Sequence, residues 1–443
     1  MSKFKKNLTY VYSTNIILGV LGFSFIPLAV YFIGVEKYGV YSIFIIITSF
    51  AGIVEYGVTK FFTRELARMK DSEGQIYNLK LCVGIYLKIA ISVVIISPVF
   101  IKIIPTYIFP IEDNYFLVGL IAAFSLLDFL LSLPTTIVRM YNIGNEKFNL
   151  LSKFNLISGV SRHLTLLISL VIFQSVIILI ITTLLRRLID IYYANKFMEK
   201  LPYSAWKPIF IKGKFKEVIN QSFYLSMSQL IQVSVVSIGV YLINMNYSLK
   251  ELGIYKSSFD LASKIWFISN GLGIVIYPRF SALNANKENK EILLNKVIKF
   301  TKVSWVIYNI VFILAIIIVP YINSFLNIQN LNLFFLLFFG LCLNAHSNLN
   351  FEFLQSKGKF RLVSLLNVSI IFIIVISFVL LNGRLGFITI GYSWLLSQLI
   401  YSFCIDFSVI KQKSNQRMKF LSLDFLVKVA MILLSLTFFR VFY

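Results

Sequence analysis

The sequence is built from repeated apolar runs of about 20 residues, separated by short segments rich in lysine and arginine. A run of this length is what an α-helix needs to cross the hydrocarbon core of a bilayer. Hydrophobic residues make up 58% of the chain and charged residues only 14%, so a water-soluble core could not bury the apolar excess. The sequence therefore predicts an all-α, polytopic membrane protein of about twelve transmembrane helices.

We place the spans at residues 11–33, 40–59, 81–104, 115–138, 152–173, 174–195, 218–244, 254–278, 303–323, 331–353, 361–381 and 385–409. The first stretch is long enough to span and has no small-residue cleavage site in the usual place, which predicts a retained helix rather than a signal peptide. A further apolar stretch at 421–442 contains Asp424, Lys428 and Arg440. It is either a thirteenth span or a helix on the membrane surface.

The positive charges alternate between the two ends of successive spans. Of the 42 Lys and Arg residues, 32 fall in the N-terminal tail and every second segment after it, and 4 fall in the intervening segments. Because loops rich in Lys and Arg stay in the cytoplasm, the N-terminus is predicted to be cytoplasmic. The net charge is +23, and no separate basic domain is present. We therefore interpret the basic residues as setting the membrane topology beside anionic lipids, and not as a surface that binds nucleic acid.

Three short motifs recur in the second half of the chain at nearly one offset. The pairs are 37–41 with 251–255, 64–67 with 279–282, and 147–152 with 359–364, at offsets of 214, 215 and 212 residues. Each copy then contains six spans, and an even number gives both copies the same orientation in the membrane. Two parallel repeats around a central cavity are predicted, an architecture that points to a secondary transporter working by alternating access.

The repeat also predicts the domain organisation. We expect an N-lobe at 1–200, a cytoplasmic linker at 201–217, a C-lobe at 218–410, and a C-terminal basic segment with an apolar helix at 411–443.

The same motifs resemble a known family. After the first span comes a turn with Gly34, Tyr38, Gly39 and Tyr41. A Glu-Tyr-Gly segment at 55–57 then leads to Arg64. Two related segments lie in the second half, at 252–255 and 276–280. This pattern resembles the polysaccharide-export branch of the multidrug/oligosaccharidyl-lipid/polysaccharide (MOP) exporter superfamily. It is similar to Wzx-type flippases of O-antigen and capsule repeat units over nearly the whole chain.

The resemblance implies that the chain moves an undecaprenyl-diphosphate-linked oligosaccharide from the cytoplasmic to the outer leaflet of a bacterial inner membrane. It also implies polysaccharide polymerase machinery as a partner. No chemical bond need change, so no enzyme activity and no cofactor are expected. The alternative function is export of drugs or other solutes on the same fold, which would favour an acidic cavity. A polymerase or ligase would need a large outward loop, and the outward loops here are short.

Charged residues within spans are expensive and therefore candidates for function. We predict that five cations line a central cavity that holds the diphosphate: Arg64, Lys88, Arg162, Lys264 and Arg279. Four of them have a plainer interpretation. Arg64 and Arg279 are alternatively cytoplasmic anchors, Lys88 alternatively reaches the interface from near a helix end, and Arg162 alternatively neutralises Asp128.

Three acids are candidates to bind a proton or a sodium ion that drives the cycle: Glu55, Asp128 and Asp260. The alternative is that each forms a structural salt bridge, and Asp260 can pair with Lys256 one turn before it. For His346, which lies among Asn and Ser residues within a span, a helix–helix hydrogen bond is favoured over a place in the sugar path. With two histidines and no suitable ligand spacing, no metal site is expected.

Overall fold

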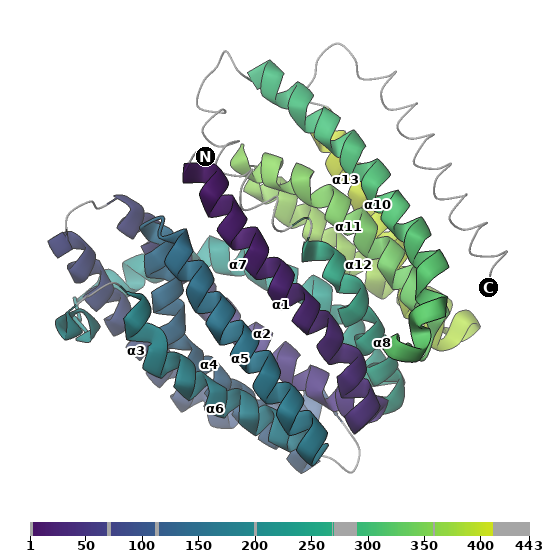
Figure 1. The fold of residues 1–443 in the computed structure, drawn as a ribbon, viewed down its shortest axis with the longest axis horizontal. Helices are drawn as coiled ribbons and strands as arrows, with labels where there is room; N and C mark the ends of the chain where they lie inside the picture. The colour runs from purple at the N-terminus through teal and green to yellow at the C-terminus, as the bar shows by residue number, and fades with distance from the viewer. Residues whose placement is uncertain are drawn as a thin grey trace. The chain divides into compact units, whose positions relative to one another are not determined.

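The computed structural model describes residues 3–68, 72–110, 115–198, 202–267, 269, 290–357 and 359–410. Over these residues the chain forms helices and no strands, and it divides into two compact units, Met1–Gly253 and Ile254–Tyr443 (Figure 1). The predicted all-α membrane fold is confirmed. The stretch 421–442 and Arg279 lie outside the described residues.

The helices of unit 1 run from the N-terminus to the start of α8. They are α1 (Lys3–Ile33), α2 (Val35–Arg68), α3 (Ser72–Ile103), η1 (Ile104–Ile108), α4 (Tyr115–Gly144), α5 (Phe148–Phe173), α6 (Val176–Ala194), η2 (Asn195–Phe197), η3 (Tyr203–Trp206) and α7 (Lys214–Asn246).

The helices of unit 2 follow from α8 (Leu249–Ala262), within which the two units divide. They are η4 (Ser263–Ile265), α10 (Lys290–Leu326), α11 (Leu331–Ser356), α12 (Phe360–Leu385), η6 (Gly386–Ile388) and α13 (Thr389–Ile410). The division after Gly253 places α7 in unit 1. The predicted linker at 201–217 follows from the sequence repeat, whereas the division after Gly253 follows from the packing of the helices. The predicted lobe boundary therefore stays a prediction.

In the described part of the chain, nine helical stretches are long and apolar enough to cross a membrane, and the last, Arg361–Val409, contains both α12 and α13. Two helices that lie at predicted spans are too charged or too short to be counted among these stretches. The helix α6 carries Arg186, Arg187 and Asp190, and α8 is only 14 residues long.

Apolar side chains cover the outside of these helices. Ile95 of α3, Val379 and Leu380 of α12 and Tyr321 of α10 are each at least 68% exposed. Exposure of these apolar side chains is unfavourable in water but favourable in hydrocarbon. Hydrocarbon also offers no hydrogen-bond partner to backbone polar groups. Helices meet this condition because each satisfies its own backbone N–H and C=O groups. The exposed apolar faces therefore support the membrane location of the bundle.

Within unit 1, α2 is the central helix and packs against both α4 and α7, while α1 lies along α5 (Figure 1). The core between α2, α3 and α4 is formed by fully buried side chains such as Phe62, Cys82, Phe129 and Val138. The helix α6 packs against α4 and α5. This arrangement brings the charged face of α6 against α4 and α5.

The two glycines of the repeated turn motif meet in unit 1. A Cβ on Gly253 would lie 1.9 Å from the Val35 carbonyl oxygen, and one on Gly39 would lie 2.8 Å from the Leu249 carbonyl oxygen. Val35 and Leu249 are related by the same 214-residue offset as the glycines. The contact is therefore reciprocal, and it allows two helix backbones to approach more closely than any larger residue permits.

The segment between α6 and α7 packs onto α3. The backbone N–H of Ile209 donates to the Lys80 carbonyl at 3.1 Å, and a Cβ on Gly84 would lie 2.4 Å from the Ile209 carbonyl oxygen. The Nζ atom of Lys88 lies 5.5 Å from the ring centre of Phe210 and 5.4 Å from that of Phe215. This segment is thus held by backbone and cation–π contacts.

Within unit 2, α11 is the most buried helix and packs against α10 and α13, while α12 packs mainly against α13 (Figure 1). Aromatic rings fill the space around α11, including Phe335, Phe339 and Trp394. Polar side chains of α11 are also buried, which a helix inside a membrane bundle permits only where they find hydrogen-bond partners.

Candidate functional site

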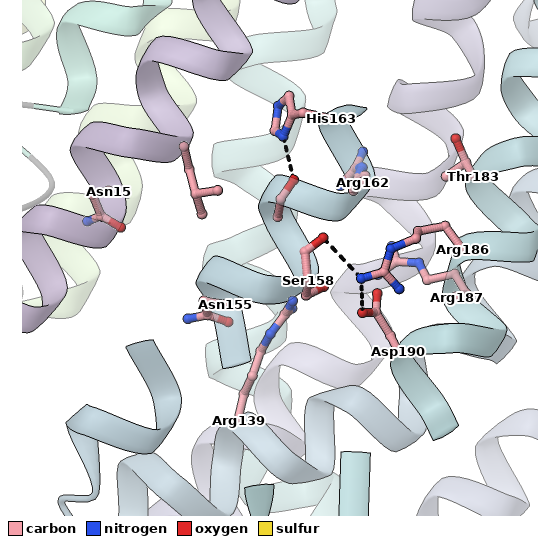
Figure 2. A pocket seen from close by; sticks show the side chains of 12 residues that line it. Asn15, Arg139, Asn155, Ser158, Arg162, His163, Thr183, Arg186, Arg187 and Asp190 are labelled. Atoms are coloured by element: carbon pink, nitrogen blue, oxygen red, sulfur yellow. Dashed lines mark hydrogen bonds and ion pairs between the residues drawn. The ribbon is translucent and has the colours of Figure 1, made fainter. Parts of the chain in front are cut away.

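A cavity of about 260 Å³ lies within unit 1, among α1, α4, α5 and α6 (Figure 2). Its walls are polar and strongly basic. They are formed by Asn15, Leu18, Arg139, Asn155, Ser158, Gly159, Arg162, His163, Thr183, Arg186, Arg187 and Asp190. We call Arg139, Arg162, Arg186 and Arg187 the arginine cluster. Four guanidinium groups around one small cavity require either carboxylates or an anionic ligand to offset their repulsion.

Two members of the arginine cluster are paired with buried carboxylates. Arg187 forms a bidentate pair with Asp128 of α4, with Nε–Oδ1 at 2.8 Å and Nη2–Oδ2 at 3.0 Å. Arg186 pairs with Asp190 one turn later on α6 at 2.8 Å. Two-point Arg–carboxylate pairs fix both position and orientation. The pair of Arg187 and Asp128 therefore holds α6 against α4, whereas the pair of Arg186 and Asp190 lies within α6.

The guanidinium group of Arg186 is also held by α5. Its Nε donates to Ser161 Oγ at 3.0 Å and its Nη2 to the Ser158 carbonyl at 3.3 Å, and in Figure 2 it lies between Ser158 and Asp190. Nevertheless its Nη1 is buried and finds no acceptor among the described residues, and the same holds for Nε of Arg139. A buried donor without an acceptor costs about 1–3 kcal/mol, more for a charged group. Both atoms would be satisfied by a ligand that carries acceptor oxygens.

Positive charge remains in excess after all nearby carboxylates are counted. Besides Asp128 and Asp190, the carboxylate of Glu55 on α2 lies in the field of Arg139 and Arg187. Thr136 of α4 approaches both Glu55 carboxylate oxygens at 3.3 Å. Four arginines against three carboxylates leave a net positive site, which favours an anion.

Of the four predicted cations that the structure describes, one lines this cavity. Arg162 lines it from α5. Arg64 is exposed on α2, where it contacts Gln221 and Glu65. Lys88 lies against Phe210 and Phe215, away from the lining residues.

The two remaining predicted cations do not belong to the described part of unit 1. Lys264 lies in unit 2, in the turn η4 that ends α8, beside the ion pair of Lys256 and Asp260. Arg279 lies outside the described residues. The interpretation of Lys256 and Asp260 as a pair along their helix is confirmed.

The alternative that Arg162 neutralises Asp128 is wrong, because Asp128 is paired with Arg187. Arg139, Arg186 and Arg187 are not among the predicted site residues, because they fall among the 32 positive charges that indicate the cytoplasmic segments. A signal for α6 was nonetheless present. Two arginines and an aspartate fall within one turn of an otherwise apolar stretch, and charges in such a position usually face a partner or a cavity. That Arg139 joins them depends on how α4 packs, which the sequence does not reveal.

Comparison with known proteins identifies the fold. The structure of the lipid II flippase MurJ in an inward closed conformation has a TM-score of 0.69 and 14% sequence identity, covering 97% of this chain and 99% of that one. An inward-facing multidrug resistance MATE family transporter of the MOP superfamily has a TM-score of 0.68 and 12% identity, covering 91% and 99%. The eukaryotic MATE transporter AtDTX14 has a TM-score of 0.63 and 11% identity, covering 94% and 97%.

At these identities the likeness to solved structures concerns the fold alone. No curated protein matches the sequence. The model of the family described as "Polysaccharide biosynthesis protein", by contrast, matches residues 4–284, which is more than half of the chain and includes every residue of the arginine cluster. The chain therefore belongs to this polysaccharide biosynthesis family.

Proposed function

We propose that this protein moves undecaprenyl-diphosphate-linked oligosaccharide repeat units of O-antigen or capsule from the cytoplasmic to the outer leaflet of a bacterial inner membrane. The N-terminus lies in the cytoplasm, and transport proceeds by alternating access. The observation that carries this proposal is the arginine cluster, with its net positive charge and its buried donors that lack acceptors among the described residues.

The chemistry of the substrate explains the need for such a cluster. A diphosphate with several sugars cannot enter hydrocarbon unaided, because each polar group that loses its water partners costs several kcal/mol there. Arginine suits the head group because its planar fork donates two parallel hydrogen bonds to phosphate oxygens. Arg139 and Arg162, which the carboxylates Asp128 and Asp190 leave uncommitted, are proposed to contact the diphosphate directly.

Similarity supports a lipid-linked substrate. The family is described by polysaccharide biosynthesis, and one of the similar structures is a lipid II flippase. Other similar structures are multidrug transporters, which keep solute export as the alternative. The arginine cluster favours the flippase, since a cavity for cationic drugs would repel its ligand at four arginines. Flipping changes no covalent bond, so we propose a transporter and not an enzyme.

The energy source is proposed to be an ion gradient. Of the three predicted coupling acids, Asp128 and Asp260 are committed to ion pairs with Arg187 and Lys256. Glu55 is held by the Thr136 hydroxyl and faces the arginine cluster. We therefore propose that Glu55 is the acid that binds the coupling ion, and that this binding is linked to binding of the substrate in the cavity.

Deletion of the gene tests the proposed function. Undecaprenyl-linked repeat units should accumulate on the cytoplasmic leaflet, because synthesis continues while translocation stops. An unchanged surface glycan with no accumulation contradicts the proposal. Complementation with Arg162→Glu should fail at normal membrane levels of the protein, because charge reversal repels the diphosphate. The matched control is Lys153→Gln, which removes an exposed cation from the same helix outside the cavity and should complement fully.

A further inference from the structure

Two side-chain amides line the cavity of unit 1 on the side opposite Arg186 and Arg187. They belong to Asn15 of α1 and Asn155 of α5 (Figure 2). Both side chains are half-buried, and among the described residues neither amide has a hydrogen-bond partner within the protein. We call Asn15 and Asn155 the amide pair. The proposed contacts of the diphosphate use neither residue.

The packing of α1 against α5 determines where the amide pair lies. A Cβ on Gly159 would clash with Leu18 Cδ2, so the Leu18 side chain lies directly against the backbone of α5. Asn15 precedes Leu18, and Asn155 precedes Gly159, by about one helical turn. On the predicted topology α1 and α5 run in the same direction, since both begin at the cytoplasmic side. One turn back from the contact therefore brings both amides to the same level of the cavity.

One face of α5 forms a continuous wall of the cavity. Its lining residues have the spacing of a single helix face and are Asn155, Ser158, Gly159 and Arg162. The seven residues from Asn155 to Arg162 advance about 10 Å along the helix axis. A phosphate held at Arg162 therefore leaves space for the sugar bonded to it to reach Asn155. On the predicted topology Asn155 lies nearer the cytoplasm, which is the side toward which the sugars of the proposed substrate extend.

Amides suit the hydroxyl groups of a sugar. A side-chain amide offers two donor hydrogens and an acceptor oxygen, and a hydroxyl group likewise both donates and accepts. A phosphate group presents acceptor oxygens with negative charge, and guanidinium groups suit it better than a neutral amide. The two sides of the cavity therefore match two adjoining parts of one head group, the charged diphosphate and an uncharged sugar.

The volume of the cavity limits how much of the oligosaccharide it can hold. Pockets for drug-sized ligands measure about 300–1,000 Å³, and this cavity measures about 260 Å³. A chain of several sugars is larger than a drug-sized molecule, so it does not fit here together with a diphosphate. The sugar bonded directly to the diphosphate is the one that the arginine cluster brings beside the amide pair, and the later sugars extend out of the cavity.

We propose that the amide pair binds the first sugar of the repeat unit, the one bonded to the diphosphate. This inference rests on the proposed function, because it requires the arginine cluster to hold the diphosphate. Asn15 and Asn155 exchange hydrogen bonds with hydroxyl groups of the sugar, or with an acetamido group where the sugar carries one. Arg139 and Arg162 bind the phosphates beside it. The cavity thus recognises the junction between sugar and diphosphate, and no covalent bond forms or breaks.

Equilibrium binding of three lipids to the purified full chain tests this assignment. The lipids are undecaprenyl diphosphate, the same lipid with only the first native sugar, and the complete repeat unit. Cells that lack the glycosyltransferase for the second sugar supply the second lipid, and cells that lack this protein supply the third. The first sugar should raise the affinity about tenfold through two neutral hydrogen bonds, and the later sugars should change it less than about threefold. Equal affinity for the first two lipids overturns the proposal, as does a gain that comes only with the later sugars.

Variants distinguish this inference from the proposed function. Asn15→Ala and Asn155→Ala should each weaken binding of the lipid with one sugar about three- to tenfold, and should change binding of undecaprenyl diphosphate less than about twofold. Arg139→Gln should weaken binding of both lipids. The matched control is Asn149→Ala, which removes an exposed amide from the same helix outside the cavity and should weaken neither.

The outcomes are separable. Amide variants that weaken binding of both lipids equally would show a structural role and overturn this inference alone. A protein that binds undecaprenyl diphosphate but gains nothing from the first sugar would likewise overturn only the role of the amide pair. A protein that binds none of the three lipids would contradict the proposed function itself.

Discussion

The two units use buried polar residues in opposite ways. In unit 1 the arginine cluster has two carboxylate-paired members and buried donors, on Arg139 and Arg186, that find no acceptor among the described residues. In unit 2 both ring nitrogens of the buried His346 have partners, because Nδ1 lies 2.9 Å from Ser304 Oγ of α10 and Nε2 lies 3.3 Å from Asp406 Oδ2 of α13. Unmet donors favour an anionic ligand, whereas a buried histidine with both ring nitrogens paired joins neighbouring helices. Two halves that share short motifs have thus diverged in chemistry.

Removal of one partner from each network should show the largest difference between the units. Arg187→Gln leaves Asp128 buried without its two-point partner and should lower the free energy of unfolding by about 3–5 kcal/mol. Asn350→Leu removes one neutral donor from Asp406 and should cost about 1–3 kcal/mol. Denaturant-induced unfolding of the purified proteins in detergent measures both changes in the free energy of unfolding.

The double variant Asp128→Asn/Arg187→Gln is the control for the first change. It removes both charges and should recover most of the lost stability. If Arg187→Gln alone were as stable as the unaltered protein, the pair would not hold α6, and the comparison between the units would lose its basis.

The reciprocal glycine contact provides the next largest effect. Gly253→Ala places a methyl group 1.9 Å from the Val35 carbonyl, where backbone must move, and should lower the free energy of unfolding by about 1–3 kcal/mol. Gly39→Ala, with 2.8 Å to the Leu249 carbonyl, should have a smaller effect in the same direction. Thermal unfolding in one detergent compares the two.

Gly52 of α2 is the matched control, because nothing lies within 4 Å of an added Cβ there. Gly52→Ala should leave stability unchanged or raise it by up to about 1 kcal/mol through helix propensity. Equal destabilisation by all three changes would show that the loss comes from helix geometry and not from the contact between the repeated turns.

Lys88 should show the smallest effect. Its contacts are the rings of Phe210 and Phe215, so Lys88→Met should cost no more than about 1 kcal/mol of stability. Binding of a diphosphate lipid should change less than twofold. A loss of binding as large as that of an Arg162 variant would return Lys88 to the substrate path.

The sequence was sufficient for the fold and partly sufficient for the site. Apolar runs of spanning length and alternating positive loops predict the helices, because the bilayer imposes both patterns. Arg162 was found because it lies in the middle of an apolar run. His346 was also recognised, and its predicted helix–helix hydrogen bonds are confirmed by Ser304 and Asp406.

Pairings between helices could not be predicted in the same way. Asp128 could have met any cation on a neighbouring helix, and the packing of α6 against α4 selects Arg187. Arg139 looks like a loop charge until α4 extends past the predicted span end at 138 and carries it into the cavity, whereas Arg186 lies within the predicted span 174–195 and reaches the cavity through the packing of α6. Asp406 lies within the predicted span 385–409, but its partners are set by the packing of α13 against α11. Each of these depends on contacts between segments far apart in the chain.

Equilibrium binding of undecaprenyl diphosphate to the purified full chain tests the central claim most directly. The protein should bind it more tightly than undecaprenyl monophosphate, and Arg139→Gln should weaken the diphosphate complex about 10- to 100-fold through loss of a charge-assisted hydrogen bond. Lys153→Gln should leave it unchanged. Equal affinity for both lipids, or undiminished affinity in Arg139→Gln, would contradict the assignment of the arginine cluster to the diphosphate.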